Sequence, residues 1–270
     1  MATHRFDPNF TDKVINAMGP KIPPRLRQLM TGLVRHVHDF ARENELTVDE
    51  WMAGVELLNW AGQMSDDKRN EGQLLWNKVS STKSHFTLAG EAHDAPTATA
   101  IRGPFFRADT PWRQNGEDIV KTKPADGEMA FMHGQVLDFM SKKPLVGATV
   151  EEEFILRGKF KTGEEGGYSF YCLRPTPYPV PHDGPGGKLI ELMDLHPFRP
   201  AHIHIIATHN GYRSLTTQIF DRKDKNVESD CIFAVKNSLV VDFVPRAGDP
   251  QAGLELNYDI KLVCDAAVGA

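Results

Sequence analysis

The spacing of apolar residues divides the chain into a helical first part and a β-rich remainder. Between residues 26 and 40, apolar side chains return every three or four positions, at Leu26, Leu29, Leu33, Val37 and Phe40. This period predicts a helix, and the two prolines at 23 and 24 suit its first turn. Thr47 to Glu50 is a capping-box signature that opens a second helix, and we expect a third over residues 66–79.

From residue 101 onward, short apolar segments are separated by Gly, Pro and Asp, as is typical of an all-β sandwich. The expected strands lie at residues 131–137, 148–154, 168–173, 201–207, 215–220, 232–243 and 254–263. We therefore predict a mainly β fold. It combines an antiparallel β-sandwich domain at residues 101–270 with an N-terminal α-helical domain at residues 1–100.

Composition and charge exclude several classes of protein. The formal net charge is −5 and no basic block stands out, so a nucleic-acid footprint is absent. No apolar run approaches membrane-spanning length, and the first ten residues lack the apolar centre of a signal peptide. The three cysteines, Cys172, Cys231 and Cys264, are widely spread, which fits a reducing compartment. We expect a cytoplasmic protein that binds neither nucleic acid nor membrane.

The chemistry of the chain is concentrated around residues 199–204. His202 and His204 lie two apart in a predicted strand, so their imidazoles point to the same face and can reach one point. Imidazole is the commonest protein metal ligand, and Tyr178 and Arg199 add an oxygen donor and a fixed cation. The pattern predicts a metal site on a sheet. His36 and His38 have the same spacing, but on a helix such a pair cannot chelate.

Short, distinct motifs are distributed along almost the whole chain. They are Gly103-Pro104-Phe105, Gly134 to Asp138, Lys143 to Val150, Gly167 to Phe170, Arg174 to Pro181, Asp183-Gly184-Pro185, Arg199 to His204 and Leu215 to Gln218. Together they resemble the intradiol ring-cleaving dioxygenases, and most closely the hydroxyquinol 1,2-dioxygenase branch. The resemblance implies that the β-sandwich is catalytic. It also implies a non-haem Fe(III) enzyme that uses O2 to cleave hydroxyquinol, or a related catechol, between its ring hydroxyls.

The resemblance also implies roles for individual residues. Tyr178, His202 and His204 would be the iron ligands, Arg199 would balance the charge of the bound substrate, and Gln218 would lie behind the ligands. Part of the substrate pocket would be formed by Ile101, Arg102, Gly103, Pro104 and Phe105. The helices would mediate a homodimer, which the apolar stripe between residues 26 and 40 permits.

One part of the family pattern is missing. In that family two tyrosinates and two histidines hold the iron, and a loop after the strand at 148–151 delivers the other tyrosinate. Here residues 150–154 run almost directly into Leu156, and no Tyr occurs between residues 101 and 167. We interpret the three glutamates at 151–153 as a solvated strand end. The alternative is that Glu152 or Glu153 takes the vacant ligand position.

The missing loop leaves a second function open. The chain could be a catalytically impaired or non-catalytic relative, either a metal-poor binding protein or a structural partner. Hydrolase and nucleotide-binding functions have no support, because the sequence contains neither a Gly-x-Ser-x-Gly elbow nor a phosphate loop.

Overall fold

The computed structural model describes residues 7, 9–67, 69–80, 95–100, 110–152 and 156–265, with the backbone alone at 77–80. The chain forms two compact units, residues 1–59 and residues 60–270. The domain boundary expected at residue 100 stays a prediction.

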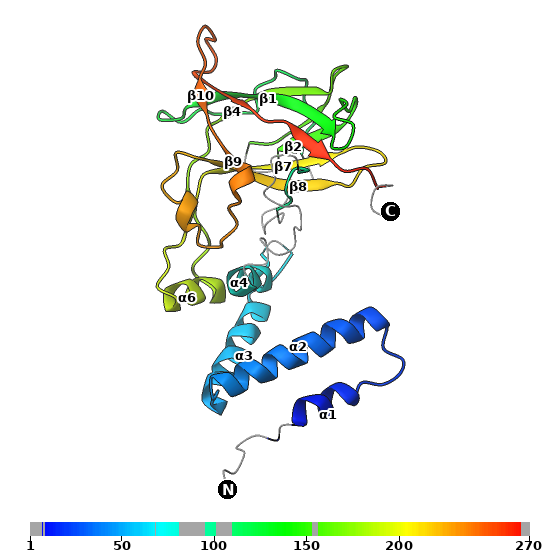
Figure 1. Ribbon diagram of the computed structural model, residues 1–270. Helices are drawn as coiled ribbons and strands as arrows, with labels where there is room; N and C mark the ends of the chain where they lie inside the picture. Colours follow the sequence, from blue (N-terminus) through cyan, green and yellow to red (C-terminus); the bar gives the residue numbers. More distant parts are fainter. Residues whose placement is uncertain are drawn as a thin grey trace. The chain divides into compact units, whose positions relative to one another are not determined.

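The first unit is helical, as the apolar period predicts (Figure 1). It contains α1 (Phe10–Asn16), α2 (Pro24–Glu43) and most of α3 (Val48–Gln63). The predicted capping box opens α3: Glu50 N donates to Thr47 Oγ1 at 3.3 Å, and Thr47 N donates to Glu50 Oε2 at 2.9 Å. The helix α1 is only seven residues long, too short for its apolar period to be recognised.

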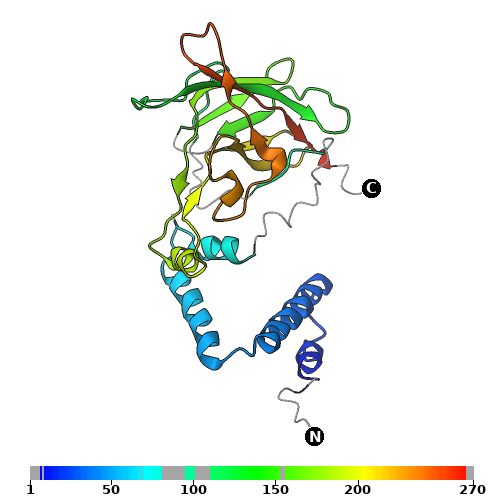
Figure 2. The same ribbon diagram turned by 60° about the vertical axis from the view of Figure 1, so that its left-hand side comes forward.

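The second unit contains two facing β-sheets (Figures 1 and 2). In the first sheet, β1 (Met129–Asp138) pairs antiparallel with β4 (Gly167–Leu173). The same strand pairs parallel with β11 (Leu254–Asn257) and β12 (Ile260–Leu262), and β10 (Val244–Pro245) extends the sheet. A bend between β11 and β12 brings the Tyr258 carbonyl against β1 at Gly134. A side-chain carbon at Gly134 would lie 2.0 Å from that oxygen, so only glycine fits there.

The second sheet has the strand order β3-β2-β7-β8-β9. These strands are β3 (Gly158–Lys161), β2 (Thr149–Glu152), β7 (His202–Thr208), β8 (Leu215–Asp221) and β9 (Val240–Val241). A separate two-stranded ribbon joins β5 (Tyr178–Pro179) to β6 (Phe198–Arg199). The prediction of a β-sandwich is confirmed, but its purely antiparallel character is wrong. Long connections return the chain in the same direction, so β1–β11, β1–β12 and β8–β9 are parallel pairs.

Side chains from the inner faces of both sheets form the main core. Ile203, Ile205 and Ala207 of β7 belong to this core, together with the stacked rings of Phe160 and Phe170. Because side chains alternate along a strand, the imidazoles of β7 lie on the outer face of their sheet. The alternation of side chains along β7 therefore places the core residues on one face of the sheet and the candidate metal ligands on the other.

Two helices pack together beside the sandwich, namely α4 (Glu71–Ser80) and α6 (Pro185–Leu192) (Figures 1 and 2). The helix α4 begins later than predicted, because Asn70 Oδ1 accepts a hydrogen bond from Gln73 N at 2.8 Å and caps it there. The strand expected at 232–243 is also wrong. That segment is mainly loop, with the 3₁₀ helix η2 (Asn237–Leu239) and the two residues of β9.

Candidate metal centre

Three candidate ligands meet at the start of β7. The Nε2 atoms of His202 and His204 lie 3.2 Å apart, and Tyr178 Oη lies 3.4 Å from His202 Nε2. The short ribbon explains the approach of the tyrosine, because β5 pairs Tyr178 with Arg199, three residues before His202. The structure thus brings together the three residues that the sequence analysis predicts as metal ligands.

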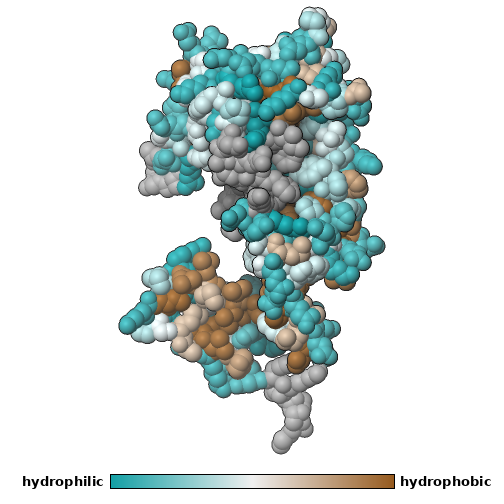
Figure 3. Space-filling model, turned by 180° about the vertical axis from the view of Figure 1, so that it is seen from behind, coloured by the Kyte–Doolittle hydropathy of each residue, from teal (hydrophilic) through white to brown (hydrophobic). Residues whose placement is uncertain are grey.

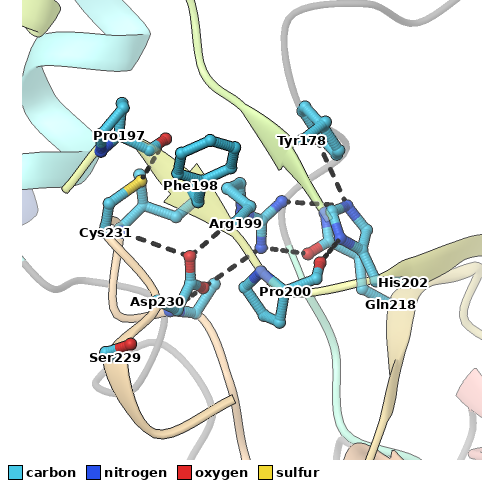
Figure 4. Close-up of polar contacts among 12 residues, drawn as sticks. Tyr178, Pro197, Phe198, Arg199, Pro200, His202, Gln218, Ser229, Asp230 and Cys231 are labelled. Carbon is cyan, nitrogen blue, oxygen red and sulfur yellow. Dashed lines mark hydrogen bonds and ion pairs between the residues drawn. The ribbon is translucent and has the colours of Figure 1, made fainter. Parts of the chain in front are cut away.

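The tautomer of His202 is set by its surroundings. Its Nδ1 lies 2.7 Å from the carbonyl oxygen of Pro200, which can only accept, so Nδ1 carries the proton. The Nε2 lone pair consequently faces Tyr178 and Arg199 (Figure 4), and Nε2 of His204 lies 3.2 Å from the same atom. This is the arrangement in which an imidazole can bind a metal ion.

The spacing of the three donors fits a shared ion. Two donors bound to one ion at about 2.0–2.2 Å, at angles near 90–110°, lie roughly 2.8–3.6 Å apart. The separations of 3.2 Å and 3.4 Å fall in this range. Among the described residues no three His, Cys, Asp or Glu side chains form a metal-binding group, so the phenol of Tyr178 is what completes a three-donor set.

Arg199 and Gln218 lie directly behind these donors. Gln218 sits opposite His204 in the β7–β8 register, and its Nε2 lies 3.4 Å from His204 Nδ1 and 3.5 Å from His204 Nε2. Arg199 donates from Nη1 to His202 Nε2 at 3.1 Å and from Nη2 to Gln218 Oε1 at 2.9 Å. Both residues are buried, which places a fixed positive charge against the donor cluster.

Burial and charge act in opposite directions on this cluster. Burial raises the pKa of Tyr178 above its ordinary value, although the nearby Arg199 charge favours the phenolate. For Arg199, burial disfavours the charged form, but the neighbouring Asp230 and Tyr178 outweigh it and hold the pKa above its usual range. Arg199 therefore stays charged in its buried position.

Sequence reasoning missed Asp230, which pairs with Arg199 through both carboxylate oxygens at 3.3 Å. It follows the 3₁₀ helix η1 (Val227–Ser229), 31 residues after its partner. A loop aspartate without a periodic neighbourhood gives no local signal of such a contact.

The four remaining tyrosines are all placed elsewhere. Tyr168 Oη donates to the Tyr258 carbonyl at 2.7 Å, and Tyr171 Oη donates to Asp249 Oδ2 at 2.9 Å. Tyr212 lies beside Asp138, and Tyr258 beside Thr97. The chain has five tyrosines in total, so Tyr178 alone can supply a phenolate to this centre.

The interpretation of residues 151–153 as a solvated strand end is wrong for the two that the structure describes. Glu151 and Glu152 are both buried, since β2 lies between β3 and β7. Glu151 forms an ion pair with Lys159 at 3.3 Å. Glu152 pairs with Ile205, so it faces the core side of the sheet and not the side of the imidazoles. This register argues against Glu152 as a direct ligand, and Glu153 lies outside the described residues.

A cavity of about 740 Å³ borders the centre. Its wall includes Tyr178, His202 and His204, and also Glu152 and Leu156, which flank the short β2–β3 connection. The expected pocket residues Ile101, Arg102, Gly103, Pro104 and Phe105 lie outside the described residues. Their role in the pocket stays a prediction.

Fold and site together define a β-sandwich protein with a candidate two-histidine, one-tyrosine metal centre. Comparison with known proteins identifies the family. The dioxygenase family model matches residues 101–264, and the catechol dioxygenase N-terminus model matches residues 23–80.

Individual relatives match over nearly their whole length. Intradiol ring-cleavage dioxygenase prcA of Aspergillus niger is 41% identical, covering 97% of this chain and 90% of the relative. Catechol 1,2-dioxygenase of Candida albicans is 40% identical, covering 96% of this chain and 93% of the relative. The solved structure of hydroxyquinol 1,2-dioxygenase from Pseudomonas putida DLL-E4 superposes with a TM-score of 0.83 at 31% identity, covering 94% of this chain and 97% of that one. The chain belongs to the intradiol ring-cleavage dioxygenase family, as its motifs indicated.

Proposed function

We propose that this protein is a non-haem iron dioxygenase that opens hydroxyquinol, or a related catechol, between its ring hydroxyls with O2. One observation carries the proposal: in a chain of this family, the side chains of Tyr178 and His204 both lie within 3.4 Å of His202 Nε2. The relatives that match over 90% and 93% of their own length are named as enzymes, which does not favour the non-catalytic alternative.

His202, His204 and Tyr178 would hold the iron, the first two as neutral imidazoles and the third as a phenolate. Fe(III) is a hard ion that prefers anionic oxygen donors, so the two catechol oxygens would chelate it, and the ion would activate the ring toward O2. Tyr178, whose Oη lies at the site, would take up one hydroxyl proton of the substrate. The buried Arg199 lies where it can balance the negative charge of the bound catecholate.

The test combines activity with metal content. The purified, iron-loaded protein should consume O2 with hydroxyquinol or catechol, produce the ring-opened dicarboxylic acid, and show a tyrosinate-to-iron absorption band in the visible. Running both substrates side by side decides between the two substrate types that the relatives' names carry. A protein that binds iron and gives neither ring-opened product would overturn the proposal.

We also propose that the protein forms a homodimer through its first unit. Apolar side chains gather on that unit (Figure 3), and the exposed ones on α2 are Leu26, Leu29, Leu33 and Phe40. A contiguous apolar patch on a helix face is typical of a protein–protein contact. A second copy of this chain presents the same patch and is its simplest occupant.

The expected location is the cytoplasm, and the thiols support it. Cys172, Cys231 and Cys264 are not joined in disulfides, as is usual in a reducing compartment. No helix within the described part of the chain has the length and apolar character needed to cross a bilayer.

A further inference from the structure

The Arg199 guanidinium connects several parts of the site. It donates to His202 Nε2 at 3.1 Å, to Gln218 Oε1 at 2.9 Å and to both oxygens of Asp230 at 3.3 Å (Figure 4). A guanidinium is planar, so fixing its Nε and Nη2 edge also fixes the direction of Nη1. The Asp230 carboxylate holds that edge.

Asp230 is itself held by the backbone of its loop. One carboxylate oxygen accepts from Ala234 N at 2.9 Å and the other from Ile232 N at 3.4 Å. The next residue anchors the loop to the segment that carries Arg199: Cys231 N donates to Phe198 O at 3.4 Å, and Cys231 Sγ donates to Pro197 O at 3.3 Å. The carboxylate therefore cannot turn away from the guanidinium without breaking backbone hydrogen bonds.

The burial of this pair indicates more than a role in stability. Arg199 and Asp230 are each 3% exposed. A buried ion pair is often no more stabilising than apolar side chains of the same size, because desolvation offsets the attraction. The charge of Asp230 has a second effect, because by holding one edge of the guanidinium it directs the remaining donors of Arg199 toward His202 and Gln218.

We propose that Asp230 is a positioning residue for ring cleavage. It holds the Arg199 guanidinium in the orientation in which it faces the metal ligands and the bound catecholate, so the segment 230–234 belongs to the functional site. This inference rests on the proposed function for the catecholate and on the contacts above for the orientation.

Removing the Asp230 charge has two opposite consequences, which makes the inference testable. Charge alone predicts tighter binding of an anionic catecholate, because the positive charge of Arg199 is no longer compensated. Orientation predicts weaker binding, because the guanidinium loses its fixed direction. A purely structural role lowers stability and leaves ligand affinity unchanged.

The experiment compares Asp230→Asn with a matched control, Asp242→Asn. Asp242 also pairs with an arginine, Arg222 at 3.0 Å, but both side chains are more than half exposed. The probe is 4-nitrocatechol, whose own absorption reports ionisation of its hydroxyls, titrated into each iron-loaded protein. We expect Asp230→Asn to bind it roughly ten- to a hundredfold more weakly and to raise KM for the substrate, and Asp242→Asn to match wild type. Unchanged or tighter binding by Asp230→Asn would overturn the inference.

Two further measurements keep the inference testable if Asp230→Asn folds poorly or the proposed function fails. Asp230→Glu keeps the charge but displaces it by one methylene, so it should bind 4-nitrocatechol with an affinity between those of wild type and Asp230→Asn. The second measurement needs no catechol and follows the ¹⁵N–¹H signal of Arg199 Nε, which is assigned by its loss in Arg199→Lys. In wild type the Nε proton should exchange slowly with water. It should exchange rapidly in Asp230→Asn and stay slow in Asp242→Asn. A slow signal in Asp230→Asn contradicts the positioning role even if wild type never cleaves a catechol.

Discussion

At the scale of single residues, the tautomer of His202 makes a direct prediction about metal binding. Its Nδ1 proton is donated to the Pro200 carbonyl at 2.7 Å, so Nε2 carries the lone pair that can bind a metal ion. We expect His202→Ala to lower iron affinity by roughly a hundredfold, since one of three donors is lost together with its fixed orientation. Competition with a coloured chelator measures the affinity. His209→Ala is the control, because His209 lies beyond β7 and contacts the Asn210 and Val146 carbonyls. Equal iron affinity in His202→Ala and wild type would contradict the assignment.

The residues of the site differ in how readily the sequence reveals them. His202 and His204 are found because strand alternation converts a spacing of two into a shared face. The sequence offers Tyr178 as an oxygen donor, and the resemblance gives Tyr178 and Gln218 their roles. Asp230 is not found, because its contact with Arg199 depends on a loop whose path no pattern encodes. The burial of Glu151 is missed for a related reason, since only strand order shows that β2 is interior.

At the scale of elements, an ion-pair cluster joins the start of α4 to the segment that follows Tyr178. Arg69 Nε donates to Glu71 Oε1 at 2.7 Å, and its two terminal nitrogens donate to Asp183 at 2.9 Å and 2.6 Å. The Glu71 side chain is 1% exposed. The hydrogen bonds from Arg69 lower the pKa of Asp183 to about 2.

This cluster predicts an acid-dependent contribution to stability. We expect Arg69→Met to lower the free energy of unfolding at pH 7 by roughly 2–3 kcal/mol, because Glu71 is left buried without its partner. Since the pKa of Asp183 is depressed in the folded state, its contribution is present above about pH 4 and is lost as the pH falls toward 2. The difference between wild type and Arg69→Met should therefore narrow over that range in urea unfolding followed by tryptophan fluorescence. Arg222→Met removes an exposed pair and should show little effect at any pH.

Elements with a long apolar period were predicted well, and those defined by contacts were not. The helix α2 and the strands β1, β4, β7 and β8 lie where the pattern placed them. The helix α6 was missed because Pro185, Gly186 and Gly187 open it, although their burial against α4 stabilises it. Parallel pairing of β1 with β11 and β12 could not be predicted, because pairing direction depends on chain path and not on residue period.

The short β2–β3 connection predicts how the missing donor can be restored. We expect a gain if the tyrosine-bearing loop that the family resemblance implies is inserted after Glu151. Its tyrosine would supply a second anionic oxygen, which should deepen the visible band and raise iron affinity. The matched control is the same graft with that tyrosine changed to phenylalanine. If the two grafts have the same spectrum and the same affinity, the connection is not where the donor is missing.

At the scale of the whole molecule, the apolar face of α2 predicts the assembly state. Leu26, Leu29 and Leu33 are each about half exposed, at 46%, 52% and 52%. Water contact with this much apolar surface is unfavourable, and a second copy would bury it symmetrically. We expect a dimer at micromolar concentration in sedimentation velocity.

Two substitutions at neighbouring positions, each of which adds one negative charge, can test which face of α2 makes that contact. Leu29→Glu would place a carboxylate in the interface on both copies, where it has no partner, and should weaken the dimer roughly a hundredfold or more. Gln28→Glu introduces the same charge one residue away, about 100° around the helix, and should leave the dimer intact. Helical content by circular dichroism should be the same for both variants, because each residue is exposed in the single chain. A wild-type monomer at micromolar concentration, or equal dissociation of both variants, would show that this face is not the dimer contact.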